Sequence, residues 1–296
     1  MSNTVRIATR RSKLALWQAN KVGEMLDVDY ELIEVTTTGD AKIDVSIAEI
    51  GGTGAFAKEI QLAVLEGSAD IAVHSAKDLP AITPEGLDLA SFPLRGDVRD
   101  ALVGSTLDSL PQGAVVGTGS QRRKAQLLNL RPDLKFEDLR GNINSRLEKS
   151  KNFDAIVVAY TALQRLNEED KVSDVLSVET MLPQVAQGAL GLEVRSGDST
   201  SLELVQKINN DDIYKCVKAE RSFLETLGGG CTIPCAAYAV IENGLIYLRA
   251  LLSSEDGSEV IRSEERMSDP YELGKKVADD ILNTQNGLKL MEELKS

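Results

Sequence analysis

The chain has 296 residues, of which 42% are hydrophobic and 4% aromatic, a length typical of about two average domains with mainly aliphatic cores. Its 33 Lys and Arg residues against 46 Asp and Glu residues give a formal net charge of −13. Binding to nucleic acid or to an anionic membrane needs a positive surface, so we expect neither partner, although this leaves room for a local basic pocket.

Over the first two thirds of the chain, short apolar segments alternate with helical patterns, which is typical of βαβ units in an α/β fold. Ser12 is a good N-cap for a helix whose apolar face includes Ala15, Ala19, Val22 and Leu26. Further helices are expected from about Ala57 to Gly67, from Ser120 and after Asn142. Strands are expected at Val5–Ala8, Leu32–Val35, Asp70–His74, Ala101–Gly104, Ala114–Gly117, Leu134–Leu139 and Asp154–Ala159.

After about Asn210 the pattern changes to that of a small α+β domain. A long helix at Asp211–Leu227 ends at three consecutive glycines. Asn243-Gly244 between two β segments predicts a type I′ hairpin, and Asp256-Gly257 predicts a second turn. Helices at Pro270–Asn283 and from Gly287 complete this part.

No targeting or membrane-spanning segment is expected. The first residues, from Met1 to Arg6, lack the apolar stretch of a signal peptide, and no run of about 18 apolar residues occurs. The three cysteines, Cys216, Cys231 and Cys235, are too few for a disulfide scaffold. We therefore expect a cytoplasmic protein from a reducing compartment.

Three predicted strands end in polar or basic residues at the start of a helix: Ala114–Gly117 before Ser120-Gln121-Arg122-Arg123, Leu134–Leu139 before Arg140-Gly141-Asn142, and Asp154–Ala159. The strand at Asp70–His74 likewise runs into Ser75-Ala76-Lys77-Asp78. Ligands of open α/β sheets bind where strand carboxyl ends meet helix N-termini, and arginine favours bidentate pairing with carboxylate or phosphate. The pattern predicts an anionic ligand; the alternative is that these are ordinary surface arginines. The arginines at or near such junctions are Arg10, Arg11, Arg99, Arg122, Arg123, Arg140, Arg146 and Arg165.

Asp78, His74 and Cys231 are the candidate reactive groups. Asp78 is either a salt-bridged turn residue or a carboxylate that stabilises positive charge and shuttles protons. His74, the single histidine, is a base, a ligand or a structural residue, and no metal site is expected from one histidine. Cys231 follows the glycines, where it could be a nucleophile or an attachment point. With Cys235 it forms a CxxxC spacing, which differs from the redox CxxC.

Six segments resemble, in order and spacing, those of the porphobilinogen deaminase (hydroxymethylbilane synthase) family, and the resemblance covers nearly the whole chain. They are Arg6-Ile7-Ala8-Thr9-Arg10 with Ser12, His74-Ser75-Ala76-Lys77-Asp78, Gly117-Thr118-Gly119-Ser120-Gln121-Arg122-Arg123, Leu139-Arg140-Gly141-Asn142, Gln187-Gly188-Ala189 and Gly229-Gly230-Cys231. The resemblance implies two α/β domains similar to type II periplasmic binding proteins, at 1–97 with 189–206 and at 103–182, and a small C-terminal α+β domain at 211–296. It implies crossings between the first two domains near Asp97–Leu102 and Pro183–Ala189.

The family joins four porphobilinogen molecules head to tail, releases ammonia at each step, and frees hydroxymethylbilane with water. Its primer is a dipyrromethane cofactor held by a thioether, which the resemblance assigns to Cys231. Each pyrrole carries an acetate and a propionate, so an arginine-lined cleft is expected in spite of the net charge of −13. Porphobilinogen is the implied substrate, and we expect a monomer.

The resemblance also carries residue roles to this chain. Asp78 is implied as the catalytic carboxylate, which would hydrogen-bond pyrrole N–H groups, assist the loss of ammonia and stabilise the cationic azafulvene. Arg99 with Asp100 matches the hinge. The implied cofactor contacts are Ser75, Lys77, Asp78, Thr118, Ser120, Arg122, Arg123, Arg140, Gly141, Gln187 and Gly188. The implied substrate contacts are Arg10, Ser12, Arg146, Arg165 and Phe56, the last on a mobile loop at 38–57.

Some residues depart from the family pattern, and none of them is a charged catalytic group. The departures are Thr53 for Lys, Ala76 for Met, Gly119 and Gln121 around Ser120, and Ala186 for Gly. Thr53 bears on the behaviour of the loop and Ala76 on the packing of the pocket. Cys235 adds a second candidate thiol. Two rival functions are an anion-binding solute receptor, which binding without turnover would favour, and a thiol redox or metal protein, which a disulfide or bound zinc would favour.

Overall fold

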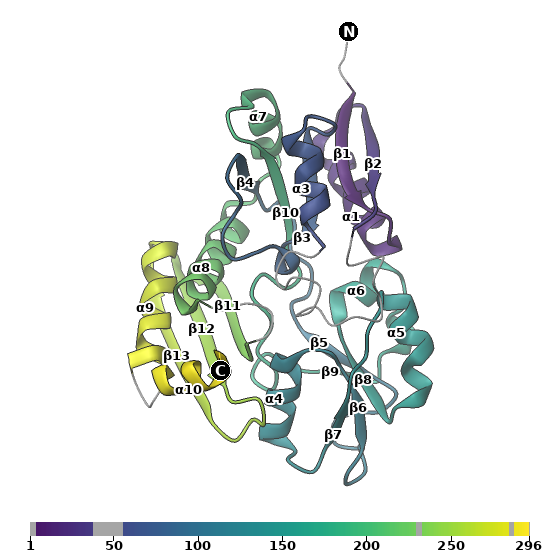
Figure 1. The fold of residues 1–296 in the computed structure, drawn as a ribbon, viewed down its shortest axis with the longest axis vertical. Coiled ribbons are helices and arrows are strands. Elements are labelled where there is room, and N and C mark those ends of the chain that lie inside the picture. Colours follow the sequence, from purple (N-terminus) through teal and green to yellow (C-terminus); the bar gives the residue numbers. More distant parts are fainter. Residues whose placement is uncertain (1–3, 38–55, 229–232, 284–286, 296) are drawn as a thin grey trace. The chain divides into compact units, whose positions relative to one another are not determined.

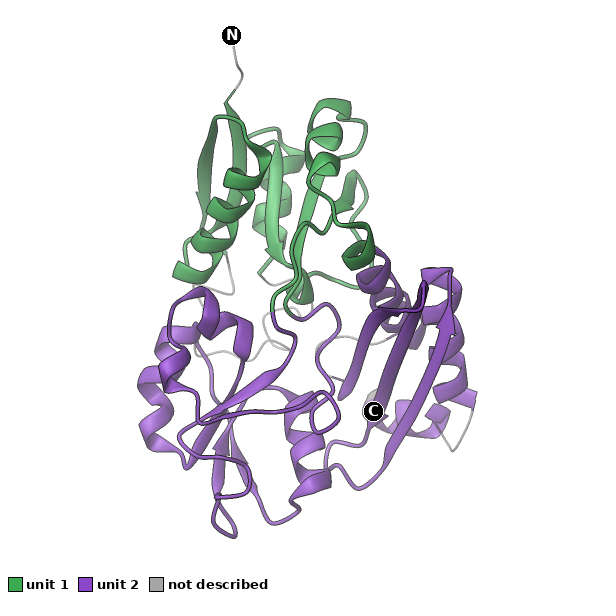
Figure 2. Cartoon of the chain, turned by 180° about the vertical axis from the view of Figure 1, so that it is seen from behind, with its two compact units in different colours: residues 1–96, 188–214 green, residues 97–187, 215–296 purple. Residues whose placement is uncertain are grey.

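The structure, a computed structural model, describes residues 4–37, 56–228, 233–283 and 287–295. It divides into two compact units (Figure 2). Unit 1 is formed by residues 1–96 and 188–214, and unit 2 by residues 97–187 and 215–296. The division into three domains stays a prediction.

The sheet of unit 1 has five strands in the order β2-β1-β3-β10-β4 (Figure 1). β1 (Val5–Arg10) pairs in parallel with β2 (Tyr30–Val35) and β3 (Ile71–Ser75). β10 (Leu190–Arg195) runs antiparallel between β3 and β4 (Leu87–Ser91). Because parallel strands end at one edge, Arg10 and Ser75 lie at the same edge of the sheet.

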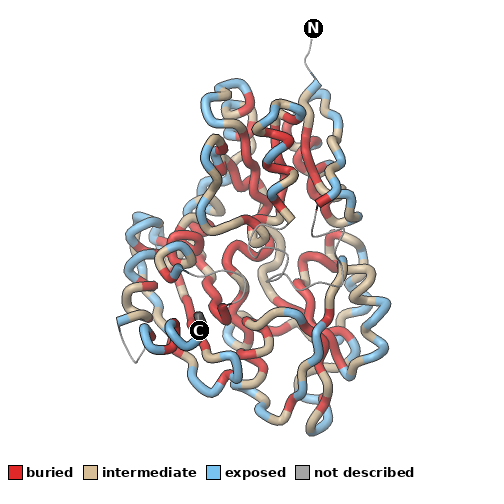
Figure 3. Tube along the Cα trace, viewed as in Figure 1, coloured by how far each residue is buried: buried red, intermediate tan, exposed pale blue. Residues whose placement is uncertain are grey.

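Helices cover both faces of this sheet, as expected when strands are buried on both sides. α1 (Lys13–Leu26) and α7 (Ser199–Lys207) pack on the face that carries Ile7 and Val73. α3 (Lys58–Leu65) packs on the opposite face, against Ala8 and Ala72. These strand residues are buried, and most of β3 and β10 is coloured as buried in Figure 3. The one-turn helix η1 (Ala76–Asp78) follows β3 directly, so it lies at the edge of the sheet where the parallel strands end.

The α/β sheet of unit 2 repeats this plan, in the order β7-β6-β8-β5-β9. β6 (Val115–Gly117) pairs in parallel with β7 (Lys135–Glu137) and β8 (Ala155–Ala159), while β5 (Asp100–Val103) is antiparallel to β8 and to β9 (Asp174–Val175). In both sheets the chain enters the antiparallel strand directly after passing from the other unit. The expected α/β class with two similar sheets is confirmed. The helices of this part are α4 (Gln121–Leu130), α5 (Ile143–Lys149), α6 (Tyr160–Arg165), η2 (Ser150–Asn152) and η3 (Glu169–Lys171).

The C-terminal part is an antiparallel three-stranded sheet with helices, as predicted. It contains α8 (Asp211–Leu227), β11 (Cys235–Glu242), β12 (Leu245–Ser253), β13 (Val260–Met267), α9 (Pro270–Asn283) and α10 (Gly287–Lys295). The hairpin turn between β11 and β12 has φ 51° at Asn243 and 80° at Gly244, which confirms the predicted Asn-Gly turn. In the described part of the chain, no helix combines the length and the apolar character that a membrane crossing requires.

Two contacts join this sheet to the α/β part of unit 2. Leu182 packs with Ala236 and Leu251 in one buried cluster. The turn between β12 and β13 lies against α4, where the Asn129 side-chain amide donates to the Gly257 carbonyl at 3.0 Å. A Cβ at position 257 would lie 2.2 Å from the Ala125 carbonyl oxygen, so only glycine fits there.

Gly257→Ala should lower the free energy of unfolding by about 1–2 kcal/mol for its left-handed backbone and by about 1–3 kcal/mol more for overpacking against α4. Gly244→Ala is the matched control, because it also has positive φ but nothing lies within 4 Å of the added Cβ. Urea unfolding of both variants measures the difference. Equal losses would contradict the close approach of the turn to α4.

Candidate functional site

A hollow of about 420 Å³ lies at the edge of the unit 1 sheet where the parallel strands β1 and β3 end. It is lined by residues from the ends of β1 and β3, from the first turns of α1 and α3, and from η1. The polar residues among them are Arg10, Ser12, Gln18, His74, Ser75 and Asp78, together with the ring of Phe56. Five residues with predicted roles, Arg10, Ser12, Phe56, Ser75 and Asp78, are thus brought together although they are far apart in sequence.

Gln18 is a pocket residue that the sequence analysis missed. Its side-chain amide donates to the Ser75 hydroxyl at 2.8 Å, and that hydroxyl lies 3.2 Å from the Gln18 carbonyl oxygen. Gln18 is buried on the face of α1 that also carries Ala15 and Ala19. A polar residue on an otherwise apolar helix face is the signal that could have identified it.

Arg10 and Ser12 have local partners that fix their positions. The Arg10 guanidinium carbon lies 4.3 Å from the centre of the Phe56 ring, which is a cation–π contact. The Ser12 hydroxyl accepts from the Ala15 amide at 3.3 Å and caps α1, as predicted. Phe56 directly precedes the first turn of α3, whereas positions 38–55 of the predicted loop, including Thr53, lie outside the described residues.

Asp78 and Lys77 belong to η1 and are half-buried. Asp78 lines the hollow, while Lys77 does not. The preceding Ala76 is 1% exposed, and a Cβ at Gly191 would lie 3.4 Å from its own, so a methyl group fills the available space. The smaller side chain at this position therefore leaves the backbone of η1 close to β10.

A buried histidine and a buried carboxylate lie close together beside the same hollow. His74 Nε2 is 3.0 Å from Glu193 Oε2, with side chains 4% and 1% exposed. The Gln61 side-chain amide lies 3.0 Å from both oxygens of Glu193. These residues come from β3, β10 and α3, so only the folded sheet brings them together.

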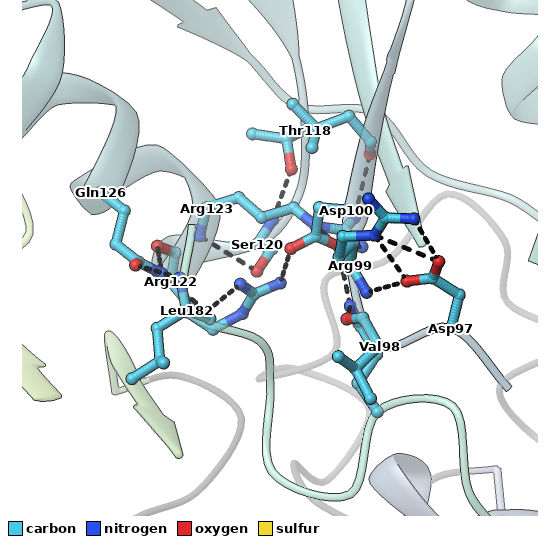
Figure 4. Close-up of polar contacts among 12 residues, drawn as sticks. Asp97, Val98, Arg99, Asp100, Thr118, Ser120, Arg122, Arg123, Gln126 and Leu182 are labelled. Atoms are coloured by element: carbon cyan, nitrogen blue, oxygen red, sulfur yellow. Dashed lines mark hydrogen bonds and ion pairs between the residues drawn. The ribbon is translucent and has the colours of Figure 1, made fainter. Parts of the chain in front are cut away.

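In unit 2 a buried carboxylate, Asp100, holds the two adjacent arginines of α4 (Figure 4). Arg122 Nη2 donates to Asp100 Oδ2 at 2.7 Å, and Arg123 donates through Nε and Nη2 to Oδ1 at 3.1 and 2.8 Å. Their remaining Nη1 groups donate to the carbonyls of Leu182 and Val157 at 2.7 and 2.9 Å. The predicted carboxylate-binding pair is therefore engaged with an internal carboxylate.

The charges of this cluster do not cancel, because two guanidinium groups face one carboxylate. Burial by itself raises the pKa of Asp100, but Arg122 and Arg123 outweigh it and hold that pKa well below its ordinary value. Arg122 Nε is buried without a hydrogen-bond partner among the described residues. The cluster thus retains one net positive charge, while its unused donor lies in the interior of the unit.

Gln187 ties this cluster to the passage between the units. Its side-chain amide donates to the Val98 carbonyl at 2.7 Å and to Asp100 Oδ1 at 3.0 Å. Gln187 thus links two chain segments of unit 2, and its contact with the cofactor stays a prediction. Gly188 follows with φ 85° and belongs to unit 1.

Ser120 and Thr118 shape the N-terminus of α4. The Ser120 hydroxyl accepts from the Arg123 amide at 3.5 Å, and the Thr118 hydroxyl accepts from the Ser120 amide at 3.2 Å. Both hydroxyls keep a hydrogen to donate, so they can also bind a ligand carboxylate. A Cβ at Gly119 would lie 2.7 Å from Asp138 Oδ1, so the Asp138 side chain would have to shift to accept a larger residue here.

Arg140, Gly141 and Arg146 form a second basic group at the N-terminus of α5. Arg140 pairs with the carboxylate of Asp138, and Arg146 Nε donates to the Gly141 carbonyl at 2.8 Å. Gly141 has φ 114°, a conformation that favours glycine. Arg165, at the end of α6, is 7% exposed, and burial lowers its pKa to about 10.

Cys231, the predicted attachment point, lies outside the described residues. The other two cysteines, Cys216 and Cys235, are buried, with exposures of 6% and 7%. Among the described residues, no group of three or more His, Cys, Asp and Glu side chains is arranged to hold a metal ion.

Two sequence models of one known family match the chain. The model described as "Porphobilinogen deaminase, dipyromethane cofactor binding domain" matches residues 5–203, and "Porphobilinogen deaminase, C-terminal domain" matches residues 214–283. A porphobilinogen deaminase of Brevibacillus brevis (strain 47 / JCM 6285 / NBRC 100599) is 44% identical over 301 residues, which cover 98% of this chain and 97% of the relative.

The chain is also similar in fold to solved structures of low sequence identity. YhfZ from Shigella flexneri has a TM-score of 0.38 and 14% identity, covering 77% of this chain and 92% of the other. A TRAP periplasmic solute-binding protein from Pseudomonas putida F1 has a TM-score of 0.39 and 11% identity, covering 75% and 80% of the two chains.

Asp100→Asn should lower the free energy of unfolding at neutral pH by about 3–5 kcal/mol, because it leaves two buried guanidinium groups without a counter-ion. A depressed carboxyl pKa stabilises the fold above the unfolded-state value near 3.8 and loses that effect as the pH falls through the folded-state value. The difference between wild type and variant should therefore shrink below about pH 4.

Asp97→Asn is the control for this prediction, because Asp97 pairs with Arg99, whose side chain is 42% exposed. Its loss should stay below about 1 kcal/mol. Chemical unfolding of both variants between pH 3 and pH 7 measures these values. Equal losses, or a difference that does not depend on pH, would refute the proposed charge balance at Asp100.

Proposed function

Since the chain belongs to the porphobilinogen deaminase family, we propose that its substrate reacts at the unit 1 hollow beside Asp78 and that the arginines of unit 2 bind pyrrole carboxylates. The chain is a transferase of tetrapyrrole and haem biosynthesis. It joins four porphobilinogen molecules head to tail with loss of ammonia, uses a dipyrromethane cofactor, and releases hydroxymethylbilane by hydrolysis. This family membership argues against the two alternative functions raised by the sequence, a solute receptor and a thiol redox or metal protein.

One observation carries the proposed location of the chemistry. Asp78, Ser75, Ser12 and Arg10 come from different elements, yet they line one hollow at the carboxyl edge of the unit 1 sheet. A hollow with a carboxylate, hydroxyls and a cation matches a substrate that has N–H donors, a developing positive charge and carboxylates. The family's aromatic position, Phe56, adds a ring against Arg10.

We assign to Asp78 the stabilisation of positive charge as the amine leaves the substrate. Its carboxylate is half-buried at the rim of the hollow, where electrostatic interactions are stronger than in bulk water. It would accept hydrogen bonds from pyrrole N–H groups and hold the ring while the bond to nitrogen breaks. Ser75, held by Gln18, lies beside it to orient the ring.

The dipyrromethane cofactor carries two pyrrole rings with four carboxylates and, when bound, supplies the carbon to which the first substrate is added. The cluster at Asp100 fits such a group, because two guanidinium groups face one carboxylate and leave one net positive charge. Arg123, Ser120 and Thr118 would bind and orient the same carboxylates. Arg140, Arg146 and Arg165 extend the basic surface of unit 2 for the carboxylates of added units.

Cys231 is the proposed attachment point. Its neighbours in the sequence, three consecutive glycines, allow the thiol to approach a bulky group. Cys216 and Cys235 are both buried, so alkylation there would require opening the C-terminal part. Their burial supports Cys231 over the second thiol of the CxxxC spacing.

We further propose a monomer that works in the cytoplasm without nucleic acid or membrane as partner. The net charge of −13 supports the absence of nucleic acid and membrane as partners, and the small number of cysteines supports the cytoplasm. We also propose three domains, at 1–97 with 189–206, at 103–182 and at 211–296. The three separate sheets support this division.

Cys231→Ser should abolish covalent loading, because an alcohol does not replace the thiolate nucleophile. Intact mass and peptide mapping after incubation with porphobilinogen measure the loading, and the wild type should gain the mass of two deaminated units on Cys231. Cys235→Ser is the matched control and should load normally. Normal loading of Cys231→Ser at another thiol would refute the assignment.

Asp78→Asn should reduce kcat by about 10²- to 10³-fold, as the loss of one preorganised charge partner does, with a much smaller change in KM. The amide keeps the shape and the hydrogen-bond acceptor but removes the negative charge. Single-turnover measurement of ammonia release on loaded enzyme checks this. An unchanged kcat in this variant would refute the proposal that the reaction takes place at the unit 1 hollow.

A further inference from the structure

Glu220 is a buried carboxylate that has no place in the function described so far. It belongs to α8 and is 0% exposed, and an ionised group in the interior is costly unless partners compensate. Its Oε2 accepts from the Ala186 amide at 2.6 Å, and its Oε1 accepts from the Ala239 amide at 2.8 Å. Ala239 lies in β11 of the C-terminal part, whereas Ala186 lies in the segment through which the chain leaves the α/β part of unit 2. Glu220 therefore joins these two parts of the unit.

The two hydrogen bonds explain why this residue is a glutamate. A carboxylate accepts through both of its oxygens, whereas a glutamine would turn its NH₂ group toward one of the two amides. A hydrophobic side chain would accept from neither backbone N–H group, and a buried N–H without an acceptor is costly. The charge is thus retained for a bridge between two backbone segments.

Ala186 depends on this bridge. It is 0% exposed and has φ 60°, the left-handed conformation that strains a residue with a Cβ. The φ angle is a rotation about the bond from the amide nitrogen to Cα, so a hydrogen bond to that amide restrains it. Release of the amide would let φ return to the favoured negative range and would turn the next residue, Gln187.

Gln187 carries the effect to the arginines. Its side-chain amide donates to Asp100 Oδ1 at 3.0 Å, and Asp100 holds Arg122 and Arg123. All four residues are at most 5% exposed, and in a close-packed interior a displacement at one residue is passed to its neighbours. One peptide bond therefore separates the residue that Glu220 holds from the residue that contacts the carboxylate of the arginine cluster.

The position of Glu220 on α8 relates the bridge to the cofactor. This helix ends at Leu227, and Cys231, the proposed attachment point, follows four positions later in the sequence. A cofactor bound to that thiol meets the arginines in a productive geometry when the two are held in fixed positions. Glu220 connects the helix before the thiol to the segment that carries Gln187.

We propose that Glu220 is a positioning residue for the cofactor: it holds Ala186 and Gln187 so that the arginine cluster keeps its geometry relative to the helix that precedes the attachment thiol. Ala186 stands where the family has glycine, so in this chain the carboxylate supports a conformation that glycine adopts without strain. The role rests on the proposed binding of cofactor carboxylates by the arginines of unit 2.

Glu220→Gln is the first test, because it keeps the shape of the side chain and one acceptor. At a temperature where the variant is fully folded, hydrogen exchange of the segment 183–189 should become faster. Covalent loading at limiting porphobilinogen should slow by about 3- to 30-fold, the range of coupling through packed contacts. KM for elongation should rise by a similar factor with kcat nearly unchanged, because the arginines bind carboxylates in the ground state and the transition state alike.

Glu225→Gln is the matched control. It removes the same charge from the same helix, but at an exposed position, so exchange, loading and KM should all match the wild type. A Glu220→Gln variant that is indistinguishable from this control would overturn the proposal.

Ala186→Gly is the second test, a rescue. Glycine adopts φ 60° without the hydrogen bond, so Glu220→Gln combined with Ala186→Gly should recover most of the loading rate and of KM, and Ala186→Gly alone should load like the wild type. A purely structural Glu220 would lower the thermal unfolding midpoint without changing KM of the folded protein, or would cause a loss that glycine does not restore. Either result would overturn the proposal.

A third test separates the positioning role from the function on which it rests. If Glu220 acts through Gln187, Glu220→Gln should add little to KM in a Gln187→Met background, whereas equal factors in both backgrounds would refute the coupling. Arg123→Gln with wild-type loading and KM would refute the proposed binding of carboxylates at the cluster. An impaired Arg123→Gln beside a normal Glu220→Gln would refute the positioning role alone.

Discussion

The second unit depends on one buried carboxylate. Asp100 begins β5, immediately after the chain enters unit 2, and it binds both arginines at the start of α4 together with the Gln187 amide. Without it, two guanidinium groups would lie in the interior without a counter-ion, at a cost of several kcal/mol. The same bonds fix the ends of β5 and α4 and the segment around Gln187. The basic site, the sheet and the passage between units therefore share one interaction.

In unit 1, too, neighbouring side chains fix the positions of polar groups. Its hollow is built at the carboxyl edge of the sheet, and two polar side chains there are held by other side chains: Ser75 by Gln18 and Arg10 by the ring of Phe56. Such support limits the motion of groups that must meet a small substrate with defined geometry. Both units thus place fixed polar groups at the ends of parallel strands.

The departures from the family pattern have local explanations in three cases. Gly119 leaves room for the Asp138 carboxylate, which pairs with Arg140. Ala76 fits beside Gly191 in a space of methyl size. Ala186 adopts φ 60°, an unfavourable conformation for a residue with a Cβ, and its amide donates to Glu220 at 2.6 Å. This hydrogen bond to a carboxylate stabilises a backbone conformation that glycine would adopt without strain.

The sequence by itself determined the α/β class, the start of the C-terminal part, the Asn-Gly hairpin and most elements, because these depend on local periodicity, caps and turns. It did not indicate β4, β9, β10 or α7, some of which are short and all of which depend on partners distant in the chain. It also identified the polar strand ends, and with the family resemblance it assigned Asp78 and the arginines.

Only the tertiary structure decided what these side chains contact. The sequence shows Asp100 as a hinge residue and Arg122 as a ligand-binding residue, but their mutual bond joins positions 22 residues apart. Gln18 and Ser75 are 57 residues apart, and Gln61 and Glu193 are 132 apart. Burial of charge is a property of the packed sheet, since a strand pattern says which residues are inside but not which partner compensates them.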